Sequence, residues 1–263
     1  MPPTSERGFT LVETIVVIVI TGIVATMVAV FLRGSVETYV AQDRRARLVD
    51  TADTALRRIG RDVRLALPNS TRVASAGSLN ALEFLITRSG GRYRADGGGD
   101  VLDFTQPDTG FDVIGPAIAM QAGDAIAVYN LGIPGADAWA GDTLTDYSGA
   151  AGPTTHIAIA SKRFPLDAPA HRFFVVEGPV SYVCDPVAGT LTRYWGYVPQ
   201  AAQPTAFAAG VPHALLARDV VACSMTYQPG VTERNGLVSI TLQLAQAGER
   251  VRLYAATLVG NEP

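Results

Sequence analysis

The sequence predicts an α+β protein in which one long N-terminal helix packs on a large antiparallel β-rich head domain. Three observations support this fold class. An uncharged apolar run covers residues 14–32, and apolar residues then recur every three to four positions as far as Leu67. After Pro68 the period changes to two, most clearly in residues 237–244. The longer period is typical of a helix face, and the shorter one of a half-buried strand.

The composition is that of a folded protein with a sizeable core. The chain has 263 residues, of which 48% are hydrophobic, enough for one anchored domain or two small ones. Its formal net charge is −3 and its pI is about 5.6. Because a general nucleic-acid-binding protein carries a basic domain or stripe, this charge balance argues against nucleic acid as a partner.

The apolar run has the length of a membrane span. Residues 14–32 contain no charge, and as a helix they would extend about 28 Å at about 1.5 Å per residue. A cleaved secretory signal has a shorter apolar region followed by a site of small residues, whereas Phe31, Leu32 and Arg33 stand here. We therefore expect a single-pass membrane anchor.

Glu13 places a carboxylate at the start of this run. An acidic residue at the centre of a membrane helix costs roughly 2.5 to 3.5 kcal/mol on insertion scales, and it costs less near the helix end. Glu13 could therefore simply mark the interfacial end of the span. Its surroundings favour a second interpretation, because the stretch GFTLVE at residues 8–13 follows a short polar leader, MPPTSER.

This N-terminus resembles the class III signal of type IV pilins and type II secretion pseudopilins. The resemblance implies that residues 1–8 are a leader peptide, that a prepilin peptidase cuts after Gly8, and that Phe9 becomes the N-methylated amino terminus. It also implies that Glu13 pairs with the terminal amine of a neighbouring subunit during assembly, since opposite charges attract strongly in a poorly hydrated setting. Residues 9–32 would form the transmembrane and filament-core helix, with the leader on the cytoplasmic side of the inner membrane and the C-terminal domain in the periplasm.

The helical pattern continues through residues 33–67 as an amphipathic segment. The remaining positions of this segment carry charges of both signs with Arg in excess, and they form either a solvated face or a surface for lateral contact with neighbouring subunits. Pro68 is predicted to end the helix because proline lacks a backbone donor and restricts the preceding residue. The apolar face comprises Val36, Val40, Val49, Ala52, Leu56, Ile59, Val63 and Leu67.

Residues 68–263 are predicted to form the β-rich globular domain. A turn at Gly248-Glu249 leads from residues 237–244 into a last strand, which gives a C-terminal hairpin. Loops rich in Gly or Pro are expected at residues 95–100, 133–153 and 199–212. The other expected strands cover residues 81–86, 101–104, 124–129, 156–160, 172–176, 180–184, 190–197 and 220–227.

The body of the chain also resembles a known family, the MshO-like minor pilins of MSHA-type pili. The resemblance is carried by RLALPNSTRV, HRFFVVEGPVSYVC, GTLTRYWGY, LARDVVAC, NGLVSITLQLAQAGERVRLY and the terminal NEP. It implies a minor pilin that acts in pilus assembly or initiation at or near the filament tip. Its partners would be the major pilin, other minor pilins and, indirectly, the inner-membrane assembly platform with its ATPase. A large head also favours the tip, because no subunit lies above it there.

Two other functions stay open. The alternative within the same class is a J-like minor pseudopilin of a type II secretion system. From a different class, it would be a membrane-anchored periplasmic binding or adhesive protein that never enters a filament.

The two cysteines, Cys184 and Cys223, are too few and too far apart for a structural zinc site. If the domain lies in an oxidising periplasm, a Cys184–Cys223 disulfide is expected. Two buried free thiols are the alternative.

No catalytic site, cofactor or metal site is predicted. His156, His171 and His213 form no metal-binding pair and lie near no Gly-x-Ser-x-Gly turn, and the chain has no phosphate-binding loop. Three acids in one Gly-rich loop, Asp137, Asp142 and Asp146, match no defined calcium loop, and loop solubility also explains them.

Four aromatic residues have two interpretations. They form either an adhesive patch or ordinary turn and core packing. These residues are Trp139, Tyr147, Trp195 and Tyr197.

Overall fold

The computed structural model describes residues 8–230 and 235–260, and of residues 32–35 it describes the backbone only. Most of the predicted leader and the terminal NEP therefore lie outside the described residues. The chain falls into two compact units, Met1–Arg47 and Leu48–Pro263. The predicted head begins at residue 68, whereas the second unit begins inside the helix at Leu48. The predicted α+β class is confirmed, because one long helix precedes a large antiparallel β-rich domain.

The helix α1 (Leu11–Val63) is continuous over 53 residues. It is long and apolar enough to cross a membrane, with a mean hydropathy of 3.0 in its most apolar window. Residues 11–31 extend about 32 Å at about 1.5 Å per residue, close to the roughly 30 Å of a bilayer core. The helix is unbroken at Gly22, whose carbonyl accepts a hydrogen bond from the Thr26 hydroxyl at 2.8 Å.

The helix ends at Val63, four residues before the predicted end at Leu67. Ala66 already forms an isolated β-bridge with Ile86. The Leu67 N–H donates to the Leu85 carbonyl at 2.7 Å. Pairing with the sheet therefore ends the helix before the proline does.

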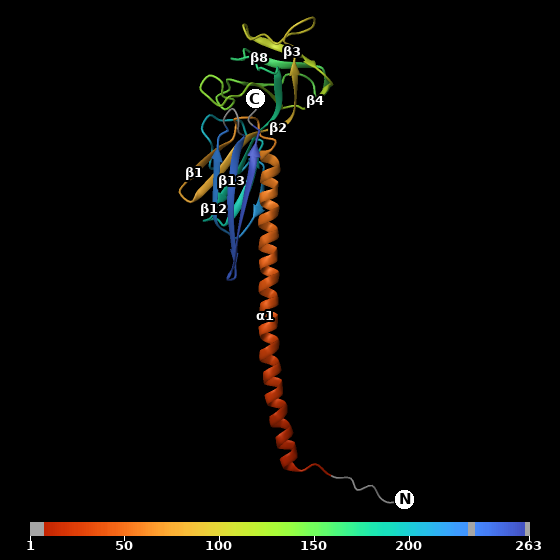
Figure 1. Cartoon of the computed structure of the whole chain (residues 1–263), viewed down its shortest axis with the longest axis vertical. Coiled ribbons are helices and arrows are strands. Elements are labelled where there is room, and N and C mark those ends of the chain that lie inside the picture. Colours follow the sequence, from red (N-terminus) through yellow and green to blue (C-terminus); the bar gives the residue numbers. More distant parts are fainter. Residues whose placement is uncertain (1–7, 231–234, 261–263) are drawn as a thin grey trace, which may run out of the picture. The chain divides into compact units, whose positions relative to one another are not determined.

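The frame of the head is a nine-stranded antiparallel sheet (Figure 1). Its strands are β1 (Arg72–Ala76), β2 (Leu79–Tyr93), β3 (Asp108–Ile114), β5 (Ala125–Val128), β6 (Leu144–Asp146), β8 (His156–Lys162), β9 (Arg172–Asp185), β10 (Thr190–Trp195) and β11 (His213–Ala217). The main path runs β11–β10–β9–β2–β3–β8, while β1 pairs with β2, and β5 pairs with β6 and β9. Two short strands, β4 (Ile118–Met120) and β7 (Gly152–Thr154), pair with each other.

The long strands β2 and β9 run through the whole head. Their register shifts on both sides of Thr87, next to the Ile86–Gly178 pair, and Gly178 has a φ of 135°. Such a φ is open to glycine and strained for other residues, and a shift of this kind bends the strand. The predicted strands at residues 172–176 and 180–184 are therefore one bent strand that serves two cores.

A second sheet consists of β12 (Val220–Gln228), β13 (Gly236–Gln246) and β14 (Glu249–Val259), in that order. Along β13, buried and half-buried residues alternate, as the period of two predicts. Ala247 and Gly248 both have positive φ, and they make the two-residue turn into β14. Such turns match the twist of the strands that they join.

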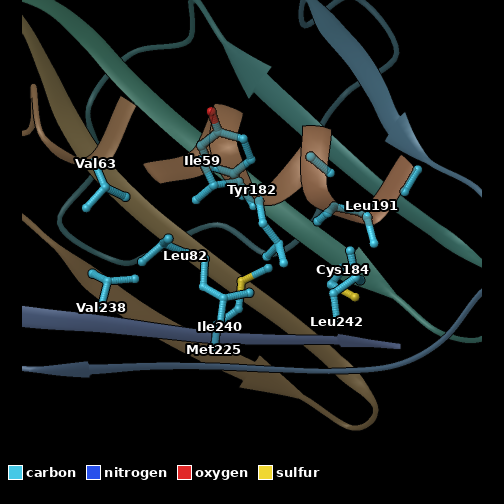
Figure 2. Packing of buried hydrophobic residues seen from close by; sticks show 14 of the residues in the cluster. Ile59, Val63, Leu82, Tyr182, Cys184, Leu191, Met225, Val238, Ile240 and Leu242 are labelled. Atoms are coloured by element: carbon cyan, nitrogen blue, oxygen red, sulfur yellow. The ribbon is translucent and has the colours of Figure 1, made fainter. Parts of the chain in front are cut away.

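The main core lies among the last turns of α1 and the two sheets. Figure 2 shows Ile59 of α1, Leu82 of β2 and Tyr182 of β9 directed into the same interior as Ile240 of β13. Val36, Val40 and Val49, which the sequence places on the buried face, are exposed. The helix residues in the core are Leu48, Ala52, Ala55, Leu56, Ile59 and Val63.

A second core fills the outer part of the head, around β3, β8 and the outer halves of β2 and β9. It includes Tyr93, Phe111, Phe164 and Phe173. Edge-to-face contacts between Phe111 and Phe173, with ring centroids 5.1 Å apart, add to the burial of these rings. A third, smaller cluster contains Trp139 and Leu85.

Residues 101–104 are not a strand, contrary to the prediction. The Leu102 N–H donates to the Arg94 carbonyl at 3.0 Å, and Asp103 Oδ1 accepts the Thr105 N–H at 2.6 Å. Asp favours such turns because its side chain bonds the backbone two residues on. Strands β1, β3, β4, β6, β7 and β11 have no predicted counterpart, since they are short or interrupted by Gly, Asp, Ser or Thr.

Candidate functional site

The predicted processing site lies just before the helix. Gly8 and Phe9 are exposed and not helical, and Thr10 caps the helix. The Thr10 hydroxyl accepts the Glu13 N–H at 3.3 Å, and the Thr10 carbonyl accepts the Thr14 N–H at 3.2 Å. A capping threonine satisfies backbone donors that the first turn leaves free. The helix therefore begins at Leu11, with only Phe9 and Thr10 between it and the peptide bond that the resemblance assigns for cleavage.

Glu13 is the third residue of α1. Thr10 and Glu13 have the Thr-x-x-Glu spacing of a capping box, a local sequence signal for the start of a helix. A carboxylate in the first turn also interacts favourably with the helix dipole. Among the described residues, no cation lies within ion-pair distance of the Glu13 carboxylate. Glu13 thus has a structural role within the chain, and its carboxylate can accept a partner from outside.

The apolar first part of α1 is exposed all around. Its large side chains point in every direction, and none of the most apolar window is buried. A helix that is apolar on every side is stable in a membrane or in the core of a larger assembly. The apolar segment of α1 therefore needs an apolar environment from outside the described chain.

Asp62, which the sequence assigns to the charged face of the helix, is buried in the head with 6% of its surface exposed. Its Oδ2 accepts the Tyr182 hydroxyl at 2.6 Å and Arg193 Nε at 2.8 Å. Arg58 Nε lies 3.2 Å from Asp62 Oδ1. A buried carboxylate is tolerated when it is paired and hydrogen-bonded, so this network fixes α1 to β9 and β10.

Glu83 is a second buried carboxylate, on β2, with no exposed surface. Arg72 Nε donates to Glu83 Oε2 at 2.7 Å, and the Tyr197 hydroxyl donates to Oε1 at 2.6 Å. Burial raises the pKa of Glu83, although the bonds from Tyr197 and Arg72 act in the opposite direction. The Arg72 guanidinium also lies 3.7 Å from the centroid of the Trp139 ring.

Glu83 gives the head a specific dependence on pH. The folded state holds the Glu83 proton above the ordinary pKa of 4.5, so in this window it binds more protons than the unfolded chain. Stability therefore falls as pH rises from the unfolded pKa through the folded one. We expect the wild type to lose unfolding free energy relative to Glu83→Gln as pH rises over that range. Urea unfolding at a series of pH values measures this difference.

The control for this experiment is Glu177→Gln, since Glu177 is exposed and pairs with Arg88 at the surface. Its difference from the wild type should stay nearly constant over the same pH range. A Glu83→Gln difference that is also constant would contradict the assignment.

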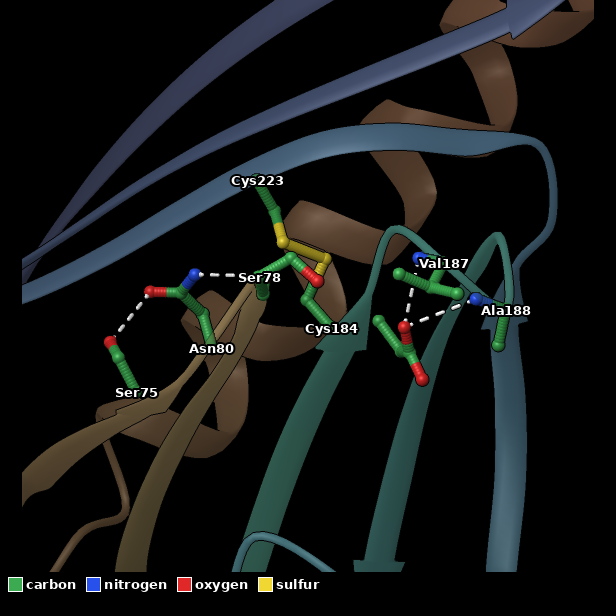
Figure 3. The surroundings of a disulfide bond; sticks show 8 residues. Ser75, Ser78, Asn80, Cys184, Val187, Ala188 and Cys223 are labelled. Atoms are coloured by element: carbon green, nitrogen blue, oxygen red, sulfur yellow. Dashed lines mark hydrogen bonds between the residues drawn. A yellow bond between two sulfur atoms is a disulfide. The ribbon is translucent and has the colours of Figure 1, made fainter.

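Cys184 and Cys223 form a disulfide that joins β9 to β12 (Figure 3), with an S–S distance of 2.05 Å and a Cα–Cα distance of 6.5 Å. Of the two states that the sequence leaves open, the structure has the bridge. Closing a 39-residue separation contributes about 4 kcal/mol in the chain-entropy model. The disulfide thus ties the two sheets together beside the main core.

The three histidines lie in separate places. His156 Nδ1 is 3.1 Å from Asp112 Oδ1, and His171 Nδ1 is 3.3 Å from Asp167 Oδ1. His213 Nδ1 is 3.0 Å from the carbonyl of its own loop, at residue 211. Among residues 8–230 and 235–260, no group of three or more His, Cys, Asp or Glu side chains could hold a metal ion.

The acids of the Gly-rich loop shape the loop itself. Asp137 Oδ1 accepts the Trp139 N–H at 3.0 Å, and Asp142 Oδ2 accepts the Asp137 N–H at 3.2 Å. Asp146 is the last residue of β6. These contacts give the two loop carboxylates a role in local turns.

The four aromatic candidates belong to different parts of the head. Trp139 is in the third cluster and donates from Nε1 to the Ser70 carbonyl at 2.8 Å. Trp195 packs on the main core and Tyr147 on the outer one, while Tyr197 is bonded to Glu83. Their contacts are therefore those of packing and local hydrogen bonding.

Comparison with known proteins identifies the N-terminal segment. Residues 3–29 match the family model of the prokaryotic N-terminal methylation motif. Neither the curated proteins nor the solved structures give a match. The match covers most of the expected leader, the predicted processing site at Gly8 and most of the apolar run, and families with this motif are structural rather than enzymatic. The N-terminus of this chain is therefore a class III signal of the type IV pilin and pseudopilin kind.

Proposed function

We propose that this protein is a minor pilin of a type IV pilus of the MSHA type, and that it acts in pilus assembly at or near the filament tip. The observation that carries the proposal is the methylation motif at residues 3–29, followed by one continuous helix that is exposed and apolar in its first part and ends in a large β-rich head. The role is structural, and no catalytic residue is assigned to the chain.

Processing comes first in the proposed mechanism. A prepilin peptidase hydrolyses the peptide bond between Gly8 and Phe9, and the new Phe9 amine then accepts a methyl group from an electrophilic methyl donor and loses a proton. Exposure of both residues and the start of the helix at Leu11 support this step, because a peptidase needs accessible, non-helical backbone. The Thr10 cap lets the helix keep its first turn after the leader is removed.

Assembly follows through the apolar helix. Residues 9–32 leave the membrane for a filament core, where Glu13 meets the amine of a neighbouring subunit. A carboxylate without a charged partner is costly in an apolar medium, and pairing with an amine offsets that cost. Glu13 therefore favours the register in which its helix and its neighbour's amine are aligned.

The head supports a position at or near the tip. The second compact unit contains 216 residues, from Leu48 to Pro263, and it holds two large cores. Such a head is difficult to place between stacked neighbours, but at the tip no subunit lies above it. The disulfide supports a periplasmic location for the head, because such bonds form and persist in oxidising compartments.

Deletion of the gene tests the proposed function. We expect loss or strong reduction of surface pili, seen by electron microscopy, with protein export through the type II system unchanged. Loss of secretion with intact pili would instead identify a pseudopilin. If neither pili nor secretion changes, the protein is an anchored periplasmic protein and the proposal is wrong.

A further inference from the structure

A basic groove lies within the head unit between α1 and the last strand, β14. Its volume is about 580 Å³, and one wall carries Arg57, Arg61 and Arg64 from the end of the helix. The opposite wall is residues 253–257 of β14, and Leu56 contributes apolar surface to the lining. The groove therefore combines an apolar part with a charged rim.

The charges in this groove are not balanced within the described chain. Arg57 pairs with Asp53 at 2.7 Å. Arg61 and Arg64 are exposed, and no described carboxylate lies within ion-pair distance of either. Cations near a helix C-terminus interact favourably with its dipole, but this effect leaves their side chains free to bind an anion. The groove thus presents two available guanidinium groups.

The strand wall has an open edge. Within the described chain β14 pairs only with β13, and five consecutive residues of β14 line the groove. Alternate residues of a strand point to opposite faces of the sheet. Five consecutive residues can therefore line one groove only when the groove runs along the edge of the strand and contacts its backbone. An open edge presents unpaired N–H and C=O groups that can bond an added strand.

The helix and the strand meet closely at one point of the groove. A Cβ atom on Gly60 would lie 3.0 Å from Thr257 Oγ1, so Gly60 lets the two elements approach. Away from this contact the arginines stand beside the open edge of β14. Charged side chains at an edge hinder pairing with unsuitable strands, and positive charges there would select an acidic one.

We propose that this groove binds an extended acidic segment of a neighbouring subunit, which pairs with the edge of β14 and places its carboxylates against Arg61 and Arg64. The partner rests on the proposed function, since a filament supplies neighbouring subunits. In strand addition, main-chain hydrogen bonds give affinity and alternate side chains give specificity. Bidentate contacts between the guanidinium groups and the carboxylates of the added segment would supply this specificity.

Binding to purified full-length protein in a zwitterionic detergent tests the inference without a pilus. The probe is a short fluorescein-labelled peptide of alternating Glu and Thr, followed by fluorescence anisotropy. We expect it to bind about ten-fold more tightly than the same peptide with Gln for Glu, and to weaken with added salt. A peptide N-methylated at alternate backbone nitrogens should also bind about ten-fold more weakly, because it cannot complete the strand pairing.

Variants of the protein locate the site. Arg61→Glu with Arg64→Glu should remove binding, whereas Arg61→Lys with Arg64→Lys should keep only part of it, because lysine retains the charge but cannot make the bidentate contact. Arg250→Glu is the control, because Arg250 is exposed on the same strand but does not line the groove. Circular dichroism checks that each variant is folded, as expected for exposed positions.

Three results would overturn the inference. The first is equal binding of the Glu and Gln peptides, and the second is unchanged binding by the double Glu variant. The third is binding of phosphatidylglycerol in mixed micelles through Arg61 and Arg64 without binding of either peptide, which would identify a lipid site. Each of these leaves the proposed function intact, because that function is tested by gene deletion.

Discussion

Replacement of Glu13 by alanine is expected to leave leader cleavage intact and to prevent incorporation of the protein into a filament. Cleavage after Gly8 depends on the leader and on the accessible backbone before α1, neither of which Glu13 supplies. Assembly depends on the carboxylate, because without it the amine of the neighbouring subunit is left unpaired in an apolar filament core. Breaking such a buried pair costs about 3 kcal/mol or more, which is a loss of roughly a hundred-fold in the association constant.

Glu13→Gln separates the charge from the helix cap. The Thr10 hydroxyl accepts the backbone N–H of residue 13, and glutamine keeps the capping-box sequence as well as glutamate does. If the charge matters, Glu13→Gln fails in assembly as Glu13→Ala does, although its helix start is preserved. If only the cap matters, Glu13→Gln assembles normally and Glu13→Ala does not.

The measurement needs two readouts from the same cells. Mass spectrometry of the N-terminal peptide reports cleavage and N-methylation at Phe9, and immunoblotting of sheared surface fractions reports incorporation. Normal incorporation of Glu13→Gln would contradict the proposed charge pairing. Failure of cleavage in either variant would instead place Glu13 in recognition by the peptidase.

The N-terminal signal was accessible from the sequence because it is local. Gly8, Phe9 and Glu13 lie within six residues, and the apolar run that follows has no charge. A processing signal of this kind depends on the spacing of residues along the chain, which can be read from the sequence. The long helix and the alternating strand β13 are predictable for the same reason, since each has a clear period.

The features that the sequence did not reveal depend on contacts between distant residues. Asp62 looks like a member of a solvated helix face, because its neighbours in the sequence are charged. It is buried because Tyr182 and Arg193, more than a hundred residues away, cover it. Likewise, Ala66 ends the helix early because Ile86 pairs with it. The groove beside β14 joins the end of α1 to the end of the chain, and no local pattern predicts that.

These distant contacts have a mechanical meaning in the proposed filament. α1 carries any force between the filament core and the head, and its last turns are held in the head by Ile59 and Val63 in the core and by Asp62 in the polar network. The disulfide adds a covalent link between the sheets on either side of that core. The strength of the subunit therefore depends on how firmly the helix end is anchored.

Asp62→Ala tests that anchor and is expected to destabilise the head by about 3 to 5 kcal/mol. The substitution leaves Arg193, whose side chain is only 12% exposed, as a buried charge without its carboxylate, and it removes the acceptor of the Tyr182 hydroxyl. Loss of one partner of a buried pair has this effect because the remaining charge stays desolvated. The control is Asp53→Ala, which breaks an exposed pair with Arg57 on the same helix and should cost no more than about 0.5 kcal/mol.

Urea unfolding followed by tryptophan fluorescence measures both variants, since the two tryptophans of the chain, Trp139 and Trp195, lie in the head. A second substitution isolates the cause. If the cost arises from the stranded charge, Arg193→Met added to Asp62→Ala should recover part of the lost stability, although the contact of Arg193 with the Trp195 ring is lost too. Stability of Asp62→Ala within about 0.5 kcal/mol of the wild type would contradict the anchoring role, because only an exposed pair is that weak. A double variant less stable than Asp62→Ala would mean instead that Arg193 acts mainly through packing, so the order of the three stabilities decides between charge and contact.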